Sequence, residues 1–468
     1  MIDLYDDQKE CLSRLRQAMT RKKSVLFQAC TGFGKTAVST YMMAQAASKG
    51  KRCIFTVPRR ELLKQTSNTL DSYGINHSYI AGDLSHNPYA KTYIGMVDTM
   101  ARRVERGLPD ADMIIVDETH YGAGSLDAVI KYYKQRGAWV IGLSATPWKL
   151  SGKGLGCWYD DMVCGPSLSW LIDNKRLSGY RYFAGRTKPD LSKVKLSGGD
   201  YAKGELADYM EHQGVIIGDC VNQYRELAIG RLHVVRCASI KHSQMVCAQF
   251  NASGIPAAHV DGTTPDDEMR RIIQAYARRE LLVLTFCDLL TFGFDLSQAS
   301  GMDVCIESCS DLRPSKSLAA QMQYWGRALR KKPHPAIILD HVNNYLDHGR
   351  PKDERVWTLE DRNQGKKGHK EPTPPTRQCD NCFFIHSPAP ACPECGTVYE
   401  IRSREIDEIE GELVELDHDT QIKEKKKEQA RAESLDDLIE LGKRRGMKYP
   451  AKWAAHVLSA RMAKAGRR

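Results

Sequence analysis

At 468 residues the chain is too long for one ordinary hydrophobic core, and its length favours roughly three domains. Its composition, 42% hydrophobic and 27% charged, is that of a soluble globular protein; no apolar run reaches the ~18 residues of a membrane span, and the polar start MIDLYDDQKE does not fit a signal peptide. We therefore expect a cytoplasmic protein without a membrane partner. The net charge of +10 lies almost wholly in the last 28 residues, with nine Lys or Arg and no acid, which favours a nucleic-acid or protein contact at this end.

Short apolar runs alternate with helix-length segments and fall into two groups, at about 24–147 and 231–345. This alternation predicts parallel sheets covered by helices on both faces, and therefore two α/β domains. The glycine-containing KLSGKGLG and an expected helix at SLSWLIDNKRL separate the groups. The apolar runs are SVLFQA, RCIFTV, MIIVD and WVIGLS in the first group, and LHVVRC, LLVLTF, DVCIES and AIILD in the second.

The first apolar run leads directly into a glycine-rich turn, SVLFQACTGFGKT, and a helical pattern follows. Glycines let backbone N–H groups surround phosphates, and the helix N-terminus adds positive potential. Lys35 can reach the outer phosphates and the Thr36 hydroxyl can bind magnesium, although Ala29 replaces the first glycine of the usual pattern. The alternative is a glycine turn followed by a lysine by chance, but this does not explain the strand before the turn and the helix after it. The expected nucleotide-binding residues here are Thr31, Gly32, Phe33, Gly34, Lys35 and Thr36.

Two adjacent carboxylates follow another apolar run, in IIVDETH. A buried carboxylate is costly unless a cation meets it. Asp117 ends a parallel strand, so we expect it beside the phosphate loop at the carboxyl edge of the same sheet, where it would bind magnesium. Glu118 is then available to polarise the attacking water. An exposed acidic turn is the alternative, but it does not explain the pairing with GFGKT in one domain.

With these motifs the chain resembles the superfamily 2 helicases of the DEAD/DEAH-box group, with Asp117-Glu118-Thr119-His120 as the DExH box. The resemblance implies two tandem RecA-like domains, ATP and Mg²⁺ as cofactors, and nucleic acid as partner. Gln8 is similar to the adenine-reading glutamine, although the usual Arg-Pro-Tyr before it is absent. VPRRELLKQ and VDTM look like the motifs that contact the nucleic-acid backbone, through Arg59 and Thr99. LSATP carries Ser144 and Thr146, which in the family couple hydrolysis to strand movement.

The second group of runs carries two further motifs of this resemblance. LLTFGFDLS resembles the motif ending in Gly-Phe-Asp and gives Gly293 and Asp295 as nucleotide contacts. QYWGRALR matches the family's Gln-x-x-Gly-Arg-x-x-Arg, which implies catalytic roles for Gln323, Arg327 and Arg330 beside those of Lys35, Asp117, Glu118 and His120. Arginines three apart share a helix face, and a cationic finger can contribute ~10³–10⁵ in rate. A solvated face or a surface ion pair is the alternative.

The resemblance also implies that a single strand lies across both domains, bound mainly through its phosphates. Ser239 and Lys241 in RCASIKHS are the expected contacts of the second domain, and the alternative for Lys241 is the solvated start of a helix. The closest resemblance within the superfamily is to bacterial and phage DNA enzymes of the RadD-like type, which carry a cysteine cluster after the motor. It favours single-stranded or branched DNA, and RNA stays open.

Four of the fifteen cysteines stand in one cluster, CDNCFFIHSPAPACPEC. Two CxxC pairs nine residues apart can direct four thiolates at one tetrahedral Zn²⁺, which makes a structural site. Buried free cysteines are the alternative, but a short segment rich in Pro has no core to bury them. His386 lies between the pairs as a bystander. The four expected zinc ligands are Cys379, Cys382, Cys392 and Cys395, and Gly396 fits the turn after the last one.

The C-terminal residues alternate between acidic and basic character, with fourteen acids against seven bases in 401–440. Residues 434–445 fit one helix capped by Ser434 and ended by Gly446, and a second helix starts at Pro450. This basic hairpin can bind phosphates, with Trp453 stacking on a base, or a protein partner can bind the tail or the cysteine cluster. A merely solvated tail is the alternative.

We therefore predict an ATP-dependent DNA helicase or translocase that serves replication, recombination or repair. The alternatives are a duplex translocase, an RNA helicase, and an ATP-switched clamp that grips nucleic acid without travelling. The expected parts of the chain are the first RecA-like domain at 1–150, a connector at 151–228, the second RecA-like domain at 229–345, a linker at 346–378, the zinc ribbon at 379–400, an acidic segment at 401–433 and the basic helical tail at 434–468.

Overall fold

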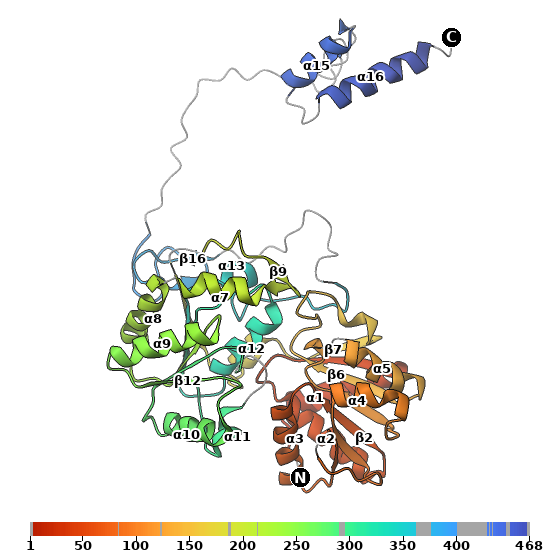
Figure 1. Ribbon diagram of the computed structural model, residues 1–468, viewed down its shortest axis with the longest axis vertical. Helices are drawn as coiled ribbons and strands as arrows, with labels where there is room; N and C mark the ends of the chain where they lie inside the picture. The colour runs from red at the N-terminus through yellow and green to blue at the C-terminus, as the bar shows by residue number, and fades with distance from the viewer. Residues whose placement is uncertain are drawn as a thin grey trace. The chain divides into compact units, whose positions relative to one another are not determined.

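The computed structural model contains two compact units, Met1–Tyr399 and Glu400–Arg468. Two parallel sheets with helices on both faces dominate the first unit (Figure 1). Among the described helices, none is both long and apolar enough to cross a membrane. The described residues are 3–82, 84–121, 124–185, 189–212, 214–289, 295–361, 376–399, 428–429, 431–432, 434–445 and 450–465.

The first sheet has seven parallel strands in the order β3-β4-β2-β5-β6-β1-β7. Every residue of β1 and β2 is buried, as expected for strands covered on both faces. The strands are β1 (Ser24–Gln28), β2 (Cys53–Val57), β3 (Ser78–Ile80), β4 (Thr92–Met96), β5 (Met113–Val116), β6 (Trp139–Ser144) and β7 (Asp161–Cys164). The helices of this domain are α1 (Asp6–Arg21), α2 (Lys35–Ser48), α3 (Arg60–Ser72), α4 (Val97–Arg103) and α5 (Gly124–Gln135).

The second sheet has six parallel strands in the order β12-β13-β11-β14-β15-β8. Its strands are β8 (Tyr180–Ala184), β11 (His233–Arg236), β12 (Ala257–Val260), β13 (Val283–Phe286), β14 (Ser308–Asp311) and β15 (Ala336–Asp340). Its helices are α8 (Gly214–Leu227), α9 (Ile240–Ala252), α10 (Asp266–Ala277), α11 (Leu296–Ser300), α12 (Leu318–Ala328) and α13 (Tyr345–His348). The two sheets confirm the predicted α/β class.

Two expectations about this part of the chain are wrong. Residues 151–228, expected to be a connector, supply β7 to the first sheet and β8 to the second. A short stretch with α6 (Leu168–Asp173) lies between these two strands. The sequence did not predict β7 and β8 because edge strands carry weak apolar patterns. The run DVCIES lies mostly before its strand, since β14 begins at Ser308 and the buried Val304 and Ile306 pack as a loop.

Within the expected linker 346–378, the described residues 357–360 contact the first domain. We call residues 350–361 the strap. The ring of Trp357 lies 5.1 Å from that of Trp148, centroid to centroid, and Trp148 Nε1 donates a hydrogen bond to the carbonyl of Glu360 at 2.8 Å. The carbonyl of Leu359 accepts from the backbone N–H of Gly156 at 3.0 Å. The chain thus returns to the first domain after completing the second sheet.

The cysteine-rich segment then packs on the edge of the second sheet. Its strands β16 (Arg377–Gln378) and β17 (Ile385–His386) form a small antiparallel ribbon. Phe384 packs edge-on against Phe183 of the edge strand β8, with ring centroids 5.6 Å apart. Gln378 Nε2 donates to the carbonyl of Ala184 at 2.7 Å. The ribbon thereby covers an edge that would otherwise expose unpaired backbone groups.

In the second unit, α15 (Leu435–Arg444) and α16 (Pro450–Ala465) pack as a helical hairpin. Ser434 caps α15 by accepting a hydrogen bond from the N–H of Asp437, as predicted. Leu438, Leu441 and Ala454 form the small core. Nearly all of the predicted acidic segment 401–433 lies outside the described residues.

Candidate nucleotide site and its surroundings

The phosphate loop joins β1 to α2 and holds two glycines in the left-handed region. Gly32 has φ 87° and Gly34, the residue before α2, has φ 95°. A Cβ at Gly34 would lie 2.5 Å from Nε2 of Gln8, and one at Gly32 would lie 2.7 Å from a methyl carbon of Leu177. The backbone conformation therefore favours glycine at both positions, and a larger residue would also have to move the ends of the Gln8 and Leu177 side chains. Lys35 Nζ donates to the carbonyl of Ala29 at 3.0 Å, which places the ammonium inside the loop.

Gln8, which the resemblance implies as the adenine-reading residue, links the start of α1 to this loop. Its side-chain oxygen accepts from the N–H of Tyr5 at 3.1 Å, and its nitrogen donates to the carbonyl of Phe33 at 2.8 Å. The Arg176 guanidinium lies 3.5 Å from the centre of the Tyr5 ring and pairs with Asp7. A planar base can stack on such a pair. Sequence reading missed Tyr5 and Arg176, because neither stands in a recognised motif.

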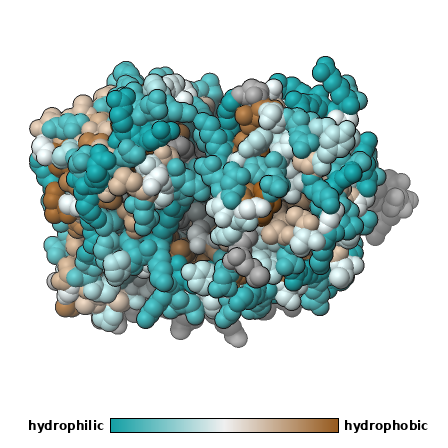
Figure 2. All heavy atoms as spheres, turned by 90° about the horizontal axis from the view of Figure 1, so that it is seen from below, coloured by the Kyte–Doolittle hydropathy of each residue, from teal (hydrophilic) through white to brown (hydrophobic). Residues whose placement is uncertain are grey.

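A cavity of ≈ 520 Å³ brings most of the predicted site residues together, and both domains line it. The first domain contributes the phosphate loop and the two carboxylates, and the second contributes Asp295 and two arginines. A hollow of largely hydrophilic character separates the two lobes on the face drawn in Figure 2. The predicted residues that line the cavity are Gln8, Thr31, Gly32, Phe33, Gly34, Lys35, Thr36, Asp117, Glu118, Asp295, Arg327 and Arg330. Gly293 lies outside the described residues.

Asp117 and Glu118 follow β5 at the carboxyl edge of the first sheet, as predicted. The N–H of Glu118 donates to Asp117 Oδ1 at 3.0 Å, and the backbone of Glu118 has φ 45°. Burial and the charge of Glu118 raise the pKa of Asp117 to about 7, against the opposing effect of Lys35. The buried Oε2 of Glu118 has no hydrogen-bond partner among the described residues. A half-buried carboxyl pair that lines a cavity fits a divalent cation and a water molecule.

His120 joins the carboxylates to the second domain. Tyr121 Oη donates to Oε1 of Gln323 at 2.8 Å, so the amide nitrogen of Gln323 faces His120 Nε2 at 3.5 Å and donates to it. His120 Nδ1 then carries the proton and donates to Ser144 Oγ at 2.9 Å, with Glu118 Oε2 at 3.3 Å. Burial lowers the pKa of His120 to about 4, so the ring is neutral at pH 7. Ser144 Oγ in turn donates to the carbonyl of Thr146 at 2.6 Å, which adds both predicted coupling residues to this network.

The two arginines reach the cavity from different local structures, and the expectation that they share one helix is wrong. Arg327 is in the last turn of α12, whereas Arg330 follows the helix end and forms a β-bridge with Leu177. Arg330 donates to Asp295 at 2.8 Å. Burial and the neighbouring Arg330 lower the pKa of Arg327 to about 10, which still leaves it charged at neutral pH. A Cβ at Gly326 would lie 2.5 Å from Cβ of Thr31, so α12 packs directly on the phosphate loop.

All eleven residues of α12 are buried, including polar ones, and a second buried network holds this helix. Arg236, at the end of β11, donates to both carboxylate oxygens of Asp311 and to Oε1 of Gln321. Asn344 also donates to Asp311, at 2.8 Å. Nε and Nη2 of Arg236 are hydrogen-bonded in this way, whereas its buried Nη1 has no hydrogen-bond partner among the described residues. A buried charge is tolerated when it is paired and hydrogen-bonded as Arg236 and Asp311 are. Sequence reading missed Arg236, Asp311 and Gln321, since a lone arginine ending a strand carries no motif.

Comparisons with known proteins agree with this geometry. The family described as "Type III restriction enzyme, res subunit" matches residues 1–149. A "51.5 kDa protein" of Lactococcus phage (isolate 7-9) is 30% identical over 405 residues, covering 84% of this chain and 83% of the phage protein. The "Putative mitochondrial ATP-dependent helicase irc3" of Schizosaccharomyces pombe (strain 972 / ATCC 24843) is 26% identical over 313 residues, covering 62% of this chain and 50% of that protein.

The chain belongs to the superfamily 2 helicases. It is therefore an ATP-hydrolysing helicase that acts on nucleic acid. It spans only half the length of the yeast relative. The structure titled "ATP-dependent Type ISP restriction-modification enzyme LlaBIII bound to DNA" superposes with a TM-score of 0.52 at 14% identity, over 72% of this chain and 27% of that one. This likeness shows that the two sheets are RecA-like domains.

The predicted nucleic-acid contacts of the helicase lie outside the cavity. Arg59 is exposed directly before α3, and Thr99 lies half-buried on α4. In the second domain, Ser239 Oγ donates to Glu211 at 2.6 Å, and Lys241 Nζ pairs with the same carboxylate at 2.9 Å. Trp453, predicted to stack on a base, packs against the hairpin core of the second unit. The structure thus gives Trp453 a packing role, and its base contact stays a prediction.

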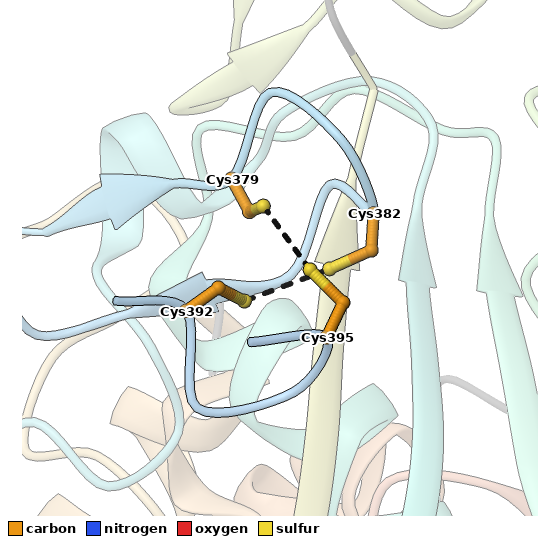
Figure 3. A group of neighbouring side chains, drawn as sticks. All are labelled: Cys379, Cys382, Cys392 and Cys395. Atoms are coloured by element: carbon orange, nitrogen blue, oxygen red, sulfur yellow. Dashed lines mark hydrogen bonds between the residues drawn. The ribbon is translucent and has the colours of Figure 1, made fainter. Parts of the chain in front are cut away.

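The four cysteines of the helicase converge as predicted (Figure 3). Their sulfur atoms lie within 4.8 Å of one another. The Sγ atoms of Cys379 and Cys395, and those of Cys382 and Cys392, are 3.6 Å apart. A tetrahedral Zn²⁺ with Zn–S bonds of ≈ 2.3 Å has sulfur–sulfur edges of about 3.8 Å, so the set fits zinc. Gly396 has φ 73° in the turn after Cys395, as the sequence predicted.

Proposed function

We propose that this helicase is a DNA-directed motor that couples ATP hydrolysis to movement on, or remodelling of, single-stranded or branched DNA in replication, recombination or repair. One observation carries the coupling. Lys35, Asp117 and Glu118 of the first domain and Arg327 of the second line a single cavity. A nucleotide bound there has to touch both domains, so a change in its phosphates changes the attraction between them.

The phosphate loop and the start of α1 bind the nucleotide. The backbone N–H groups of residues 32–36 and the ammonium of Lys35 hold the phosphates, while Gln8, Tyr5 and Arg176 hold the base. Thr36 and Asp117 would hold magnesium, which supplies positive charge against the phosphate oxygens when bound. The Thr31 hydroxyl, buried without a hydrogen-bond partner among the described residues, faces the same cavity and can donate to a phosphate.

Hydrolysis needs a base and a cation at the transferred phosphoryl group. Glu118 takes the proton of the attacking water, since it lines the cavity beside Asp117 and the phosphate loop. Arg327, with Arg330 behind it, stabilises the charge that develops on the phosphoryl oxygens. Asp295 holds Arg330 in place through the 2.8 Å hydrogen bond. Gly293 completes the same motif by resemblance alone.

The chain from Glu118 to His120 and Gln323 is the proposed route of coupling. His120 contacts Glu118 and Ser144 in one domain and Gln323 in the other. Domain separation breaks the hydrogen bond to Gln323 and frees the imidazole to reorient beside the catalytic carboxylate. Ser144 and Thr146 transmit that reorientation to the end of β6.

DNA is the proposed substrate because the family match is to a restriction-enzyme subunit and the LlaBIII structure is of a DNA complex. Arg59, Thr99, Ser239 and Lys241 are the proposed contacts to its phosphates. We also propose that the four cysteines hold one structural Zn²⁺, which would fix the ribbon on the edge strand β8. The ribbon or the tail would then serve as a contact for DNA or for a protein partner.

An ATPase assay with single-stranded DNA, duplex, fork and RNA tests the proposal, together with strand displacement on a partial duplex. We expect stimulation by single-stranded or forked DNA and displacement that depends on ATP. Arg327→Ala should slow hydrolysis with nucleotide binding nearly intact, whereas Arg59→Ala should weaken DNA binding and leave basal hydrolysis unchanged. Stimulation by RNA alone would identify an RNA helicase, and stimulation by duplex without displacement would identify a duplex translocase.

A clamp that grips without travelling is the second candidate. The two anchor points of the chain on the first domain, the stretch with α6 and the strap, favour it, because they restrict domain separation. A clamp would hydrolyse ATP yet displace nothing, and it would stay on one site in a single-molecule assay.

A further inference from the structure

Residues 190–212 form an acidic cap over the second sheet, with β9 (Leu196–Ser197), β10 (Asp200–Tyr201) and α7 (Lys203–Glu211). Tyr201, Leu206 and Met210 of this cap pack with Ala238 and Val342, which follow β11 and β15. The cap therefore lies over the carboxyl ends of the parallel strands, which is the edge where α/β sheets bind ligands. It carries five acidic and three basic residues.

Two carboxylates of the cap sit at the starts of two helices of this edge. Glu211 accepts from Ser239 Oγ at 2.6 Å and pairs with Lys241 at 2.9 Å, where Ser239 caps α9. Asp200 accepts from the N–H of Lys316 at 2.6 Å and from Ser315 Oγ at 3.0 Å, directly before α12.

The basic partner of Asp200 is much less exposed to solvent than the basic partner of Glu211. Arg313, whose side chain is 9% exposed, lies 3.6 Å from Asp200 and also pairs with Asp288, which Lys203 of the cap contacts at 2.7 Å. Lys241, by contrast, is 73% exposed. An ion pair with one partner in solvent contributes little stability, so the Glu211 contact can open while Asp200 stays in place.

Hydroxyls, lysines and helix N-termini are groups that bind phosphates. At this edge the carboxylates of Glu211 and Asp200 already accept hydrogen bonds from such groups. Hydrogen bonds from Ser239 and Lys241 lower the pKa of Glu211, so the carboxylate is charged at neutral pH. A phosphodiester reaching Ser239 and Lys241 would meet this charge.

We propose that Glu211 is an internal competitor for a nucleic-acid phosphate, which must displace it from Ser239 and Lys241 before a strand can occupy the second domain. The proposal rests on the proposed function, since it takes those two residues as phosphate contacts. The cap then raises the concentration of nucleic acid needed to stimulate the ATPase, and it acts as a threshold against weak, transient binding.

Glu211→Gln keeps the size of the side chain and removes its charge. We expect this variant to reach half-maximal ATPase stimulation at about three- to tenfold lower single-stranded DNA concentration, and to steepen the slope of log affinity against log salt by ~0.7, one phosphate contact. Glu205→Gln is the matched control, because Glu205 is on the same helix but pairs with Lys195 of the cap itself. It should behave as wild type.

The gain should vanish when Lys241 is absent. Glu211→Gln combined with Lys241→Ala should bind no better than Lys241→Ala alone, and Glu211→Ala should reproduce the gain if the effect comes from charge. Equal or weaker binding by Glu211→Gln with an unchanged melting temperature would overturn the proposal and leave the cap a structural element. Wild-type protein that hydrolyses ATP but responds to no nucleic acid would instead overturn the proposed function, and the cap proposal with it.

Discussion

Glu118 combines a catalytic position with an unusual backbone conformation. Its φ of 45° places a non-glycine residue in the left-handed region, which costs on the order of 1–3 kcal/mol. The hydrogen bond from its own N–H to Asp117 holds this turn, and the following residues form a short 3₁₀ helix at Thr119–Tyr121. The turn places the Glu118 and His120 side chains 3.3 Å apart, beside Gln323 of the other domain.

Glu118→Gln should therefore abolish turnover while preserving ATP binding. The amide keeps the shape of the side chain but cannot take a proton from water, and the loss of a general base typically lowers kcat by ~10²–10⁴. Single-turnover ATP hydrolysis and nucleotide titration measure the two effects separately. As a control, Lys35→Ala should weaken binding itself. A Glu118→Gln variant that hydrolyses ATP at a near wild-type rate would show that the DExH assignment is wrong.

The pKa of Asp117 predicts how magnesium dependence changes with pH. Because burial and Glu118 raise this pKa to about 7, Mg²⁺ has to displace a proton at lower pH, and apparent metal affinity should fall about tenfold per pH unit below that value. The Mg²⁺ concentration for half-maximal ATPase activity should be clearly higher near pH 6 than near pH 8, after correction for Mg²⁺ binding to free ATP. Equal midpoints would contradict the assignment.

The same shift affects the stability of the metal-free protein. In the unfolded chain the pKa of Asp117 is the ordinary 3.8, whereas in the folded chain burial and Glu118 raise this pKa to about 7. The free energy of unfolding should therefore fall as pH rises through this window.

At the scale of elements, sequence patterns predicted the strands and helices whose residues are buried on both faces or follow a motif. β1, α2, β5 and α12 belong to this class. β4 and β8 were not predicted, because glycine or mixed polar residues interrupt their apolar runs, and β8 also pairs with the distant strand β15. The motif residues of the cavity were predicted because they stand in local sequence patterns. Arg176 was not predicted, because its place in the site depends on a long-range contact with Tyr5 that no local pattern encodes.

The cysteine ribbon should fold around one Zn²⁺ per chain, and Cys392→Ser should lose both the metal and the ordered structure of about 379–399. Metal analysis of protein never exposed to chelator measures the first effect. Cys157→Ser is the control, because Cys157 is exposed and outside the cluster. Basal ATPase activity should survive in Cys392→Ser, since both RecA-like domains have cores of their own. If metal analysis finds no zinc in the purified protein, this prediction is wrong.

At the scale of the whole molecule, the basic hairpin holds most of the uncompensated positive charge. If a third to a half of its nine Lys and Arg engage phosphates, removing it should reduce the slope of log affinity against log salt by roughly 2–3 for a single strand. Because Leu438 and Leu441 of α15 pack with Ala454 of α16, the deletion should begin at residue 434 and remove both helices. Equal slopes would rule out the hairpin as a DNA contact.

Trp453→Ala is a poor probe of base stacking, since it also removes packing from the hairpin core. Replacing the exposed Lys452 beside it by Gln is cleaner. That change should reduce the slope by at most ~0.7 while leaving the helical content of the tail unchanged.

The strap sets a limit on how far the motor can stretch. His348 is fixed to the second domain by its hydrogen bond to the carbonyl of Ser315, at 2.8 Å, and Trp357 is fixed to the first by Trp148. Nine Cα–Cα steps separate these anchors, and they can span at most about 32 Å, at ~3.6 Å per step. A power stroke in this enzyme thus has a built-in maximum amplitude. Trp357→Ala should allow larger separations of the two domains than the wild-type protein reaches, which a pair of fluorophores on the domains can measure.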